Sequence, residues 1–390
     1  MNAKRIEIRR GLFLGRGKRG NAGRLHVHLI VRTGAVLGLL MTALIVTLIG
    51  TSFGWGTVQA QDTPILTIQQ DCEQFAISND NKIVCSVPHV RRVKKVVIQR
   101  ADIWVAAANG KEKLIVEPDK FMPVPPPSSY TVNGLAWSPD GQRIAMSMTT
   151  EHPSSEDEPA EAAKVVALLD GEGHEIKVSG SKTRFIENAT NGTWLADSST
   201  VVYLTGAGPY QIERVRPLDG QTVNLFAGHS FEAVTWDARN NQAFAVGQNL
   251  SILGREALVQ LDLLHETVRE ISRIDTYQGE MSISPSGKKI AFFEDGDTIE
   301  VHDLANPTKT IRVKAGFGRF QWGPNEKRVL LKRGPADRSN DLVWVGLYDG
   351  TFVPALHDLE YHSFAISPNG KSIAVTEPGK EVLKVFPLVE

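Results

Sequence analysis

Two short motifs in the sequence resemble parts of known catalytic or phosphate-binding sites. Residues 370–372 (GKS) resemble the end of a P-loop, and residues 228–232 (GHSFE) resemble a hydrolase nucleophile elbow. A P-loop needs another glycine where Ala365 stands and a helix afterwards, and the elbow needs a glycine where Glu232 stands. Both motifs are incomplete, so we assign no catalytic residue and interpret residues 370–372 as a hairpin turn.

One cluster has side chains that could bind a metal ion. Asp358 and Glu360 lie between His357 and His362. Because the two histidines are five residues apart, they point to opposite faces of a strand and do not share a face of a helix. A calcium ion needs six or more oxygen ligands, which nothing else in the sequence supplies. We therefore predict a polar loop and no cofactor, and Asp358 and Glu360 are the candidate metal ligands.

The densest basic group of residues 61–390 consists of Arg91, Arg92, Lys94 and Lys95. A run of this kind is typical of a solvated loop. The alternative is a binding site for an acidic or phosphate-bearing partner, since clustered cations attract such groups. These four residues are the candidate binding residues, and the sequence leaves both interpretations open.

Cys72 and Cys85 are the only cysteines. Their spacing does not match the paired C-x-x-C pattern of a zinc site. They are compatible with one disulfide if the chain is exported, because disulfides persist in oxidising compartments. The alternative is two small apolar residues within strands.

The N-terminal part of the sequence has the organisation of an export signal. Residues 1–33 form a basic arm, and residues 34–50 are seventeen residues without a charge. Residues 34–60 therefore read as the apolar and cleavage regions of a signal peptide, with cleavage before Gln61. This predicts a periplasmic or extracellular location for residues 61–390. The alternative is an uncleaved inner-membrane anchor over residues 34–56, which would then be the only part in contact with the membrane.

Charge separates this arm from the rest of the chain. Residues 1–32 carry nine Lys or Arg and one Glu, which leaves residues 33–390 with a net charge of −9 out of the total of −1. A negatively charged body is repelled by phosphate unless it concentrates basic residues in a patch. The sequence therefore predicts no nucleic-acid partner.

The elements that must position any site come from an internal repeat. Residues 135–147 (LAWSPDGQRIAMS), 281–293 (MSISPSGKKIAFF) and 364–376 (FAISPNGKSIAVT) are nearly superimposable. Four weaker copies bring the number to seven, at residues 75–87, 193–205, 234–246 and 320–332. Self-similarity at intervals of this length indicates a solenoid or a propeller.

Each copy predicts a β-hairpin. In Pro139-Asp140-Gly141 the proline presets the first corner of a turn, and the glycine supplies a positive φ. Apolar residues on both sides of the turn fall on both strand faces, so the sheet must be covered on both sides by its neighbours. A further apolar run and a polar turn, such as residues 165–178, supply a third and a fourth strand.

These units predict an all-β fold, a β-propeller of seven four-stranded blades, with six blades as the alternative. After the last hairpin the chain has one further apolar run, at residues 382–387, so the last blade lacks a strand. Propellers avoid exposed blade edges by closing the ring with a strand from the other terminus. Residues 65–68 (ILTI) are the predicted closing strand.

The repeats resemble the TolB-type (WD-like) β-propeller repeat family, whose signature here is WSPDGQRIA at residues 137–145. The resemblance covers residues 63–390 and implies a partner-binding module or a companion domain of a hydrolase. The TolB protein itself has an α/β domain before a six-bladed propeller. The present sequence lacks that domain and has seven motifs.

We therefore predict an exported, non-catalytic scaffold that binds a protein, a peptide or a cell-envelope component. Two alternatives remain open. One is a propeller enzyme of the hydrolase or lyase type, with polar residues from several blades meeting in the central channel. The other is an assembly or regulatory subunit held at the membrane by residues 34–56.

Overall fold

The computed structural model describes most of the chain after residue 58. The described residues are 59–60, 63–93, 96–117, 129–152, 161–206, 208–247, 256–274, 280–316, 318–333, 342–356, 363–377 and 382–389. Residues 1–33 and the apolar segment 34–56 lie outside them. Among the residues described, no helix is long and apolar enough to cross a membrane.

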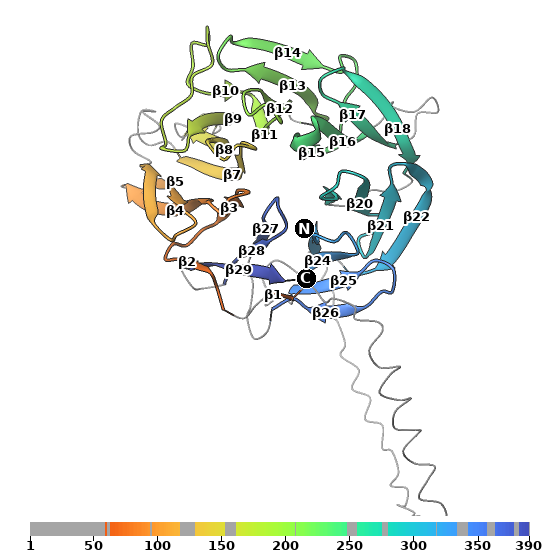
Figure 1. Ribbon diagram of the computed structural model, residues 1–390. Helices are drawn as coiled ribbons and strands as arrows, with labels where there is room; N and C mark the ends of the chain where they lie inside the picture. The colour runs from red at the N-terminus through yellow and green to blue at the C-terminus, as the bar shows by residue number, and fades with distance from the viewer. Residues whose placement is uncertain are drawn as a thin grey trace, which may run out of the picture. The chain divides into compact units, whose positions relative to one another are not determined.

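The described residues form seven antiparallel blades around a common centre, so the seven-bladed prediction is confirmed and the six-bladed alternative is wrong (Figure 1). The first three blades contain β3 (Gln74–Ile77), β4 (Ile83–Val93), β5 (Val96–Ala106) and β6 (Glu112–Val116); β7 (Ser129–Trp137), β8 (Arg143–His152), β9 (Glu161–Asp170) and β10 (Ile186–Glu187); and β11 (Ala189–Trp194), β12 (Val201–Thr205), β13 (Gln211–Arg216) and β14 (Gln221–Leu225). The next three contain β15 (Ala233–Asp237), β16 (Gln242–Gly247), β17 (Ala257–Asp262) and β18 (Thr267–Arg273); β19 (Met281–Ile283), β20 (Lys289–Phe293), β21 (Thr298–Asp303) and β22 (Asn306–Lys314); and β23 (Gly318–Trp322), β24 (Arg328–Arg333), β25 (Leu342–Gly346) and β26 (Phe352–Pro354).

The seventh blade contains β27 (Ser363–Ile366), β28 (Ser372–Thr376), β29 (Leu383–Val389) and two N-terminal strands, β1 (Gln59–Ala60) and β2 (Leu66–Ile68). In β2, Leu66 pairs with Val385 and Ile68 pairs with Leu383. The strand β1 pairs with the other end of β29. The predicted closure of the ring by an N-terminal strand is confirmed.

The repeat folds locally because its turn is stabilised by its own residues. The hydroxyl of Ser138 accepts a hydrogen bond from the backbone N–H of Arg143 at 2.9 Å and donates one to Asp140 at 2.5 Å. Gly141 has a φ of +66°, which glycine adopts at little cost. The equivalent serines Ser78, Ser284 and Ser367 are also buried. The serine of the motif therefore has a structural role.

Apolar side chains fill the spaces between adjacent blades, as the two-sided apolar strands predicted. Val84 and Ile103 of the first blade pack with Met146 and Met148 of the second. Tryptophans add hydrogen bonds across these interfaces. The indole N–H groups of Trp137, Trp236 and Trp322 donate to the backbone carbonyls of Ala76, Asn191 and Ser282 of the preceding blades, at 3.2, 2.9 and 3.0 Å. These bonds join the innermost strand of a blade, which is its first strand in sequence, to the innermost strand of the preceding blade.

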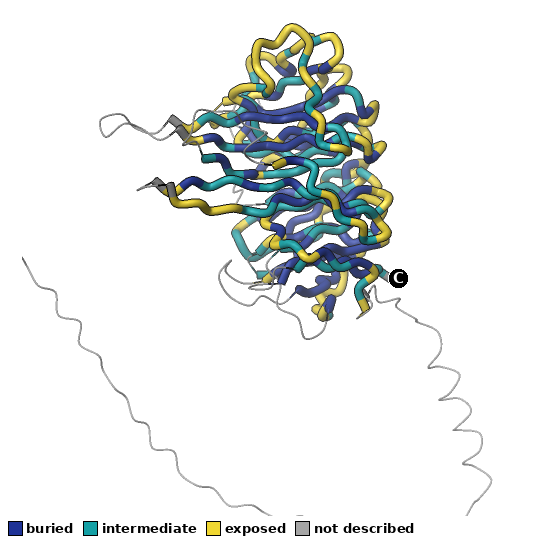
Figure 2. Tube along the Cα trace, turned by 90° about the vertical axis from the view of Figure 1, so that its left-hand side faces the viewer, coloured by how far each residue is buried: buried dark blue, intermediate teal, exposed yellow. Residues whose placement is uncertain are grey.

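The molecule has two unlike faces. We call the end that carries the Ser138-type turns the turn face, and the opposite end the hairpin face. The β4–β5 and β8–β9 hairpins both project on the hairpin face, as the long strands at the left of Figure 2 show.

Candidate interaction surface

The basic run lies on the projecting β4–β5 hairpin. Arg91 and Arg92 are exposed and belong to strand β4, where they pair with Ile98 and Val97 of β5. The interpretation of this part of the run as a loop is therefore wrong, because pairing with β5 continues to the end of β4. Lys94 and Lys95 lie outside the described residues.

Apolar side chains on this hairpin are open to solvent. The side chains of Val90 and Val97 are 71% and 52% exposed. Val90 lies opposite Gln99, and Arg92 lies opposite Val97. Alternate residues of a strand share a face, so Val90, Arg92 and Val97 lie on one face of the hairpin, and Arg91 lies on the other. The hairpin combines exposed valines with cationic side chains on both faces.

The base of the hairpin is held by the second blade. The hydroxyl of Tyr130 donates a hydrogen bond to the carbonyl of Ala101 at 2.6 Å, and the N–H of Gln99 donates to the hydroxyl of Ser129 at 3.1 Å. These contacts satisfy two backbone groups of β5 beyond the reach of β6, whose pairing with β5 begins at Ile103. The hairpin therefore presents its side chains from a fixed base.

A second feature of the hairpin face is a cavity of about 430 Å³ at the start of the inner strands. Its lining comes from the third, fourth and fifth blades and includes Glu280, Asn191 and Tyr210. Burial raises the pKa of Glu280, although its carboxylate accepts a hydrogen bond from the N–H of Phe320 at 3.1 Å and lies 3.4 Å from the guanidinium of Arg319. No sequence motif identifies Glu280, because its contacts with Arg319 and Phe320 come from the next blade.

The cavity does not gather a metal-binding set. Among the residues that the structure describes, no three His, Cys, Asp or Glu side chains are placed to hold a metal ion. Asp358 and Glu360, the candidate ligands, lie outside those residues, as do His357 and His362.

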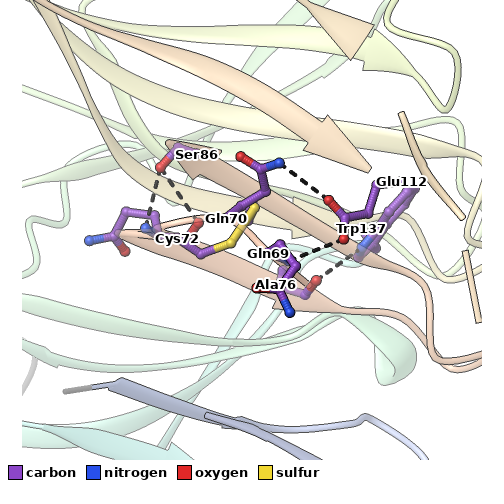
Figure 3. The surroundings of a disulfide bond; sticks show 9 residues. Gln69, Gln70, Cys72, Ala76, Ser86, Glu112 and Trp137 are labelled. Carbon is purple, nitrogen blue, oxygen red and sulfur yellow. Dashed lines mark hydrogen bonds between the residues drawn. A yellow bond between two sulfur atoms is a disulfide. The ribbon is translucent and has the colours of Figure 1, made fainter. Parts of the chain in front are cut away.

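Cys72 and Cys85 are joined by a disulfide, with their Cα atoms 5.5 Å apart (Figure 3). Cys72 follows the closing strand β2, and Cys85 lies in β4. The backbone N–H of Gln69 and the side-chain amide of Gln70 also donate hydrogen bonds to the carboxylate of Glu112, at 3.1 and 3.2 Å. The connection between the closing strand and the first blade is thus fixed covalently and by hydrogen bonds.

The two motifs that resemble parts of catalytic sites have structural roles. Gly370 has a φ of +71° in the turn before β28, and Ser372 begins that strand, so the segment is a hairpin turn as predicted. In the other motif, Phe231 is buried, and β15 follows it from Ala233. A nucleophile elbow requires a helix at that point.

Comparison with known proteins establishes the fold. No protein-family model and no curated protein sequence matches the chain. Among solved structures, a WD40-type propeller chain from the crystal structure of a mitotic checkpoint complex aligns with a TM-score of 0.57 and 14% identity. The alignment covers 87% of the present chain and 99% of that chain. At this identity the likeness shows a shared propeller architecture.

Proposed function

We propose that the chain is an exported, non-catalytic β-propeller scaffold that binds a protein or peptide partner through the β4–β5 hairpin. The observation that carries the proposal is the exposure of Val90 and Val97 beside Arg91 and Arg92 on a hairpin with a fixed base. Exposed apolar side chains next to charged ones are typical of protein interaction sites.

The basic arm and the uncharged segment before residue 61 support export. The Cys72–Cys85 disulfide supports it as well, since such bonds are rare in reducing compartments. The WSPDG turn at residues 137–141 supports a relation of the repeats to the TolB-type family. Among propellers, that relation fits a partner-binding module.

The hairpin indicates the chemistry of the partner. Arg91 and Arg92 can form charge-assisted hydrogen bonds with carboxylates, and burial of the two exposed valines against apolar side chains is favourable. A protein segment that alternates acidic and apolar side chains supplies both. We infer that the partner presents such a segment to the hairpin face.

Site-specific photocrosslinking tests the proposal. A photoreactive amino acid at position 90 should give a discrete adduct in the native compartment, and the double substitution Arg91→Glu and Arg92→Glu should abolish it. The control places the same amino acid at Leu218, which is 89% exposed in the turn between β13 and β14. Identical adducts from positions 90 and 218, or an adduct that survives the charge reversal, would refute the proposal.

A further inference from the structure

The first and second blades differ in how far the inner strand covers the projecting hairpin. In the second blade, β7 pairs with β8 as far as Ser129 opposite Glu151, next to the last residue of β8. In the first blade, β3 pairs with β4 only as far as Gln74 opposite Ser86. Residues 87–93 of β4 therefore have β5 on one side and, among the described residues, no strand on the other. We call this uncovered side of residues 87–93 the open edge.

The chain that precedes β3 does not continue along β4. The disulfide holds Cys72 against Cys85, in the part of β4 that β3 already covers. Further back, the backbone N–H of Gln69 donates a hydrogen bond at 3.1 Å to the carboxylate of Glu112, which lies opposite Ala106 at the turn-face end of the blade. The chain before β3 therefore runs back toward the turn face, and the open edge lies on the hairpin face.

The register shows which backbone groups lie on the open edge. The carbonyl of Ser86 accepts a hydrogen bond from the N–H of Glu73 at 2.9 Å, so the backbone groups of Ser86 point away from β5. In an antiparallel sheet this direction alternates along the strand, so those of Pro88, Val90 and Arg92 also point away from β5. Val90 and Arg92 each present an N–H and a C=O on the open edge, and both residues are exposed.

The opposite edge of the hairpin is partly taken up by the second blade. The N–H of Gln99 donates to the hydroxyl of Ser129, and the carbonyl of Ala101 accepts from Tyr130. Pro88 on β4 has no N–H, and proline within a sheet is typical of an edge that faces solvent. Among the described residues, the β4 side of the hairpin is thus the side that leaves room for another strand.

We propose that the partner adds an extended segment to the open edge, as a further strand of the first blade. Main-chain hydrogen bonds to Val90 and Arg92 then contribute affinity, as in other complexes formed by strand addition. Side chains of an extended segment alternate between two faces, so apolar ones can pack against Val90 while carboxylates reach Arg91 on the other face. The inference rests on the proposed function and specifies how the partner binds.

A synthetic peptide tests this mode of binding. The probe is a soluble peptide in which glutamate and valine alternate, blocked at both ends, and titration calorimetry measures its affinity for the full chain. Two derivatives carry N-methyl groups, one on every valine and the other on every glutamate. In an added strand the amides of one set point to β4 and those of the other set point to solvent. We expect one derivative to bind at least about tenfold more weakly than the parent peptide, which corresponds to the loss of one or more good hydrogen bonds, and the other to bind like the parent.

Two matched pairs of protein variants identify the edge. Val90→Pro and Val90→Ala both remove the valine side chain, but only proline also removes the N–H on the open edge, so Val90→Pro should bind the peptide more weakly. Pro88 shows that this edge accepts proline. Val97→Pro and Val97→Ala repeat the comparison on the β5 edge, because Val97 lies opposite Arg92 and its N–H points away from β4. These two variants should bind equally, and the melting temperature of each variant checks its fold.

The outcomes distinguish this inference from the proposed function. The inference is overturned if the peptide does not bind, or if the two N-methylated derivatives bind equally. It is also overturned if the amides of Val90 and Arg92 exchange in the free protein as slowly as those of His89 and Arg91, which point to β5, because the open edge would then be occupied. The proposed function is tested separately by the photocrosslink from position 90, which does not require strand pairing. A discrete adduct together with equal binding of both derivatives would leave the proposed function intact and overturn strand addition.

Discussion

Leu66 pairs with Val385, so residues near the two ends of the described chain lie side by side in one sheet. The backbone N–H of Ile65 donates to the carbonyl of Val385 at 2.8 Å, and the side chain of Ile68 is buried in the cluster that joins the seventh and first blades. This closing contact joins residues that lie near opposite ends of the sequence. The closure of the ring therefore depends on a strand of three residues that pairs with a strand near the other end of the chain.

The closing strand offers a matched pair of substitutions. Ile68→Ala should lower the free energy of unfolding by about 2–5 kcal/mol, because it leaves a cavity in a packed interface. Ile65→Ala, at a side chain that is 54% exposed, should change it by no more than about 0.5 kcal/mol. Urea denaturation measures both values. Equal effects of the two variants would show that β2 does not pack as described.

The disulfide gives a second prediction for the same region. Cys72 and Cys85 are 13 residues apart, and a bridge over a loop of this size stabilises a protein by about 3 kcal/mol, mainly through the unfolded chain. The double variant Cys72→Ser and Cys85→Ser should lose stability of that order. It should also show faster amide exchange in β2 and β29. Addition of reductant to the parent should reproduce the loss, whereas an unchanged melting temperature would contradict it.

The sequence could predict those parts of the fold that depend on local chemistry or on strand counting. The turn at Ser138 is stabilised by Asp140 and Arg143, all within six residues, so the motif alone indicates the hairpin. The strand count left the last blade one strand short, and this predicted that residues 65–68 would complete it. Seven blades follow from seven copies, since each copy begins one blade.

Features that depend on contacts between blades could not be predicted. Before β10 begins at Ile186, the chain is bonded to the next blade through Ser179 and Pro217, which no periodicity within residues 165–178 reveals. Glu280 is half-buried, and its contacts are with Arg319 and Phe320 of the sixth blade. The length of β4 depends on Ser129 and Tyr130, which support β5 from the second blade. In each case the determining partner is more than about twenty residues away.

A buried cluster between β21 and β22 predicts the response of the protein to acid. One carboxylate oxygen of Glu300 lies 2.7 Å from His302 Nε2, and the other accepts a hydrogen bond from Arg312 at 3.1 Å. Burial acts to raise the pKa of Glu300, but these two partners outweigh it, so the pKa lies below its usual value of 4.5. The ionised form therefore stabilises the fold. That contribution is complete above the unfolded-state pKa and is lost as pH falls through the folded-state pKa.

Glu300→Gln should remove this pH dependence. The variant should be less stable than the parent at neutral pH, and the difference should shrink as the pH falls below about 4.5, where the parent loses the same interaction. Thermal unfolding across the acid range measures it. Glu187→Gln, an exposed carboxylate on β10, serves as the control and should follow the parent curve. A constant difference between Glu300→Gln and the parent at every pH would contradict the prediction.

Two tryptophans on the innermost strands of their blades differ in whether the indole N–H forms a hydrogen bond. Comparing them shows how much that bond contributes to stability. Trp322 and Trp194 are both buried at the end of an inner strand, at equivalent positions of the repeat. The indole N–H of Trp322 donates to the carbonyl of Ser282, whereas the indole nitrogen of Trp194 has no hydrogen-bond partner in the described structure.

Replacement by phenylalanine removes similar apolar volume at both sites. Trp322→Phe also removes the hydrogen bond to the Ser282 carbonyl, while Trp194→Phe removes an N–H group that was already unsatisfied. We therefore expect Trp322→Phe to be less stable than Trp194→Phe by about 1 kcal/mol, the net value of a typical hydrogen bond. Urea denaturation of the two variants and the parent gives the difference. If Trp194→Phe were the less stable of the two, hydrogen bonding to the preceding blade could not be what distinguishes these positions.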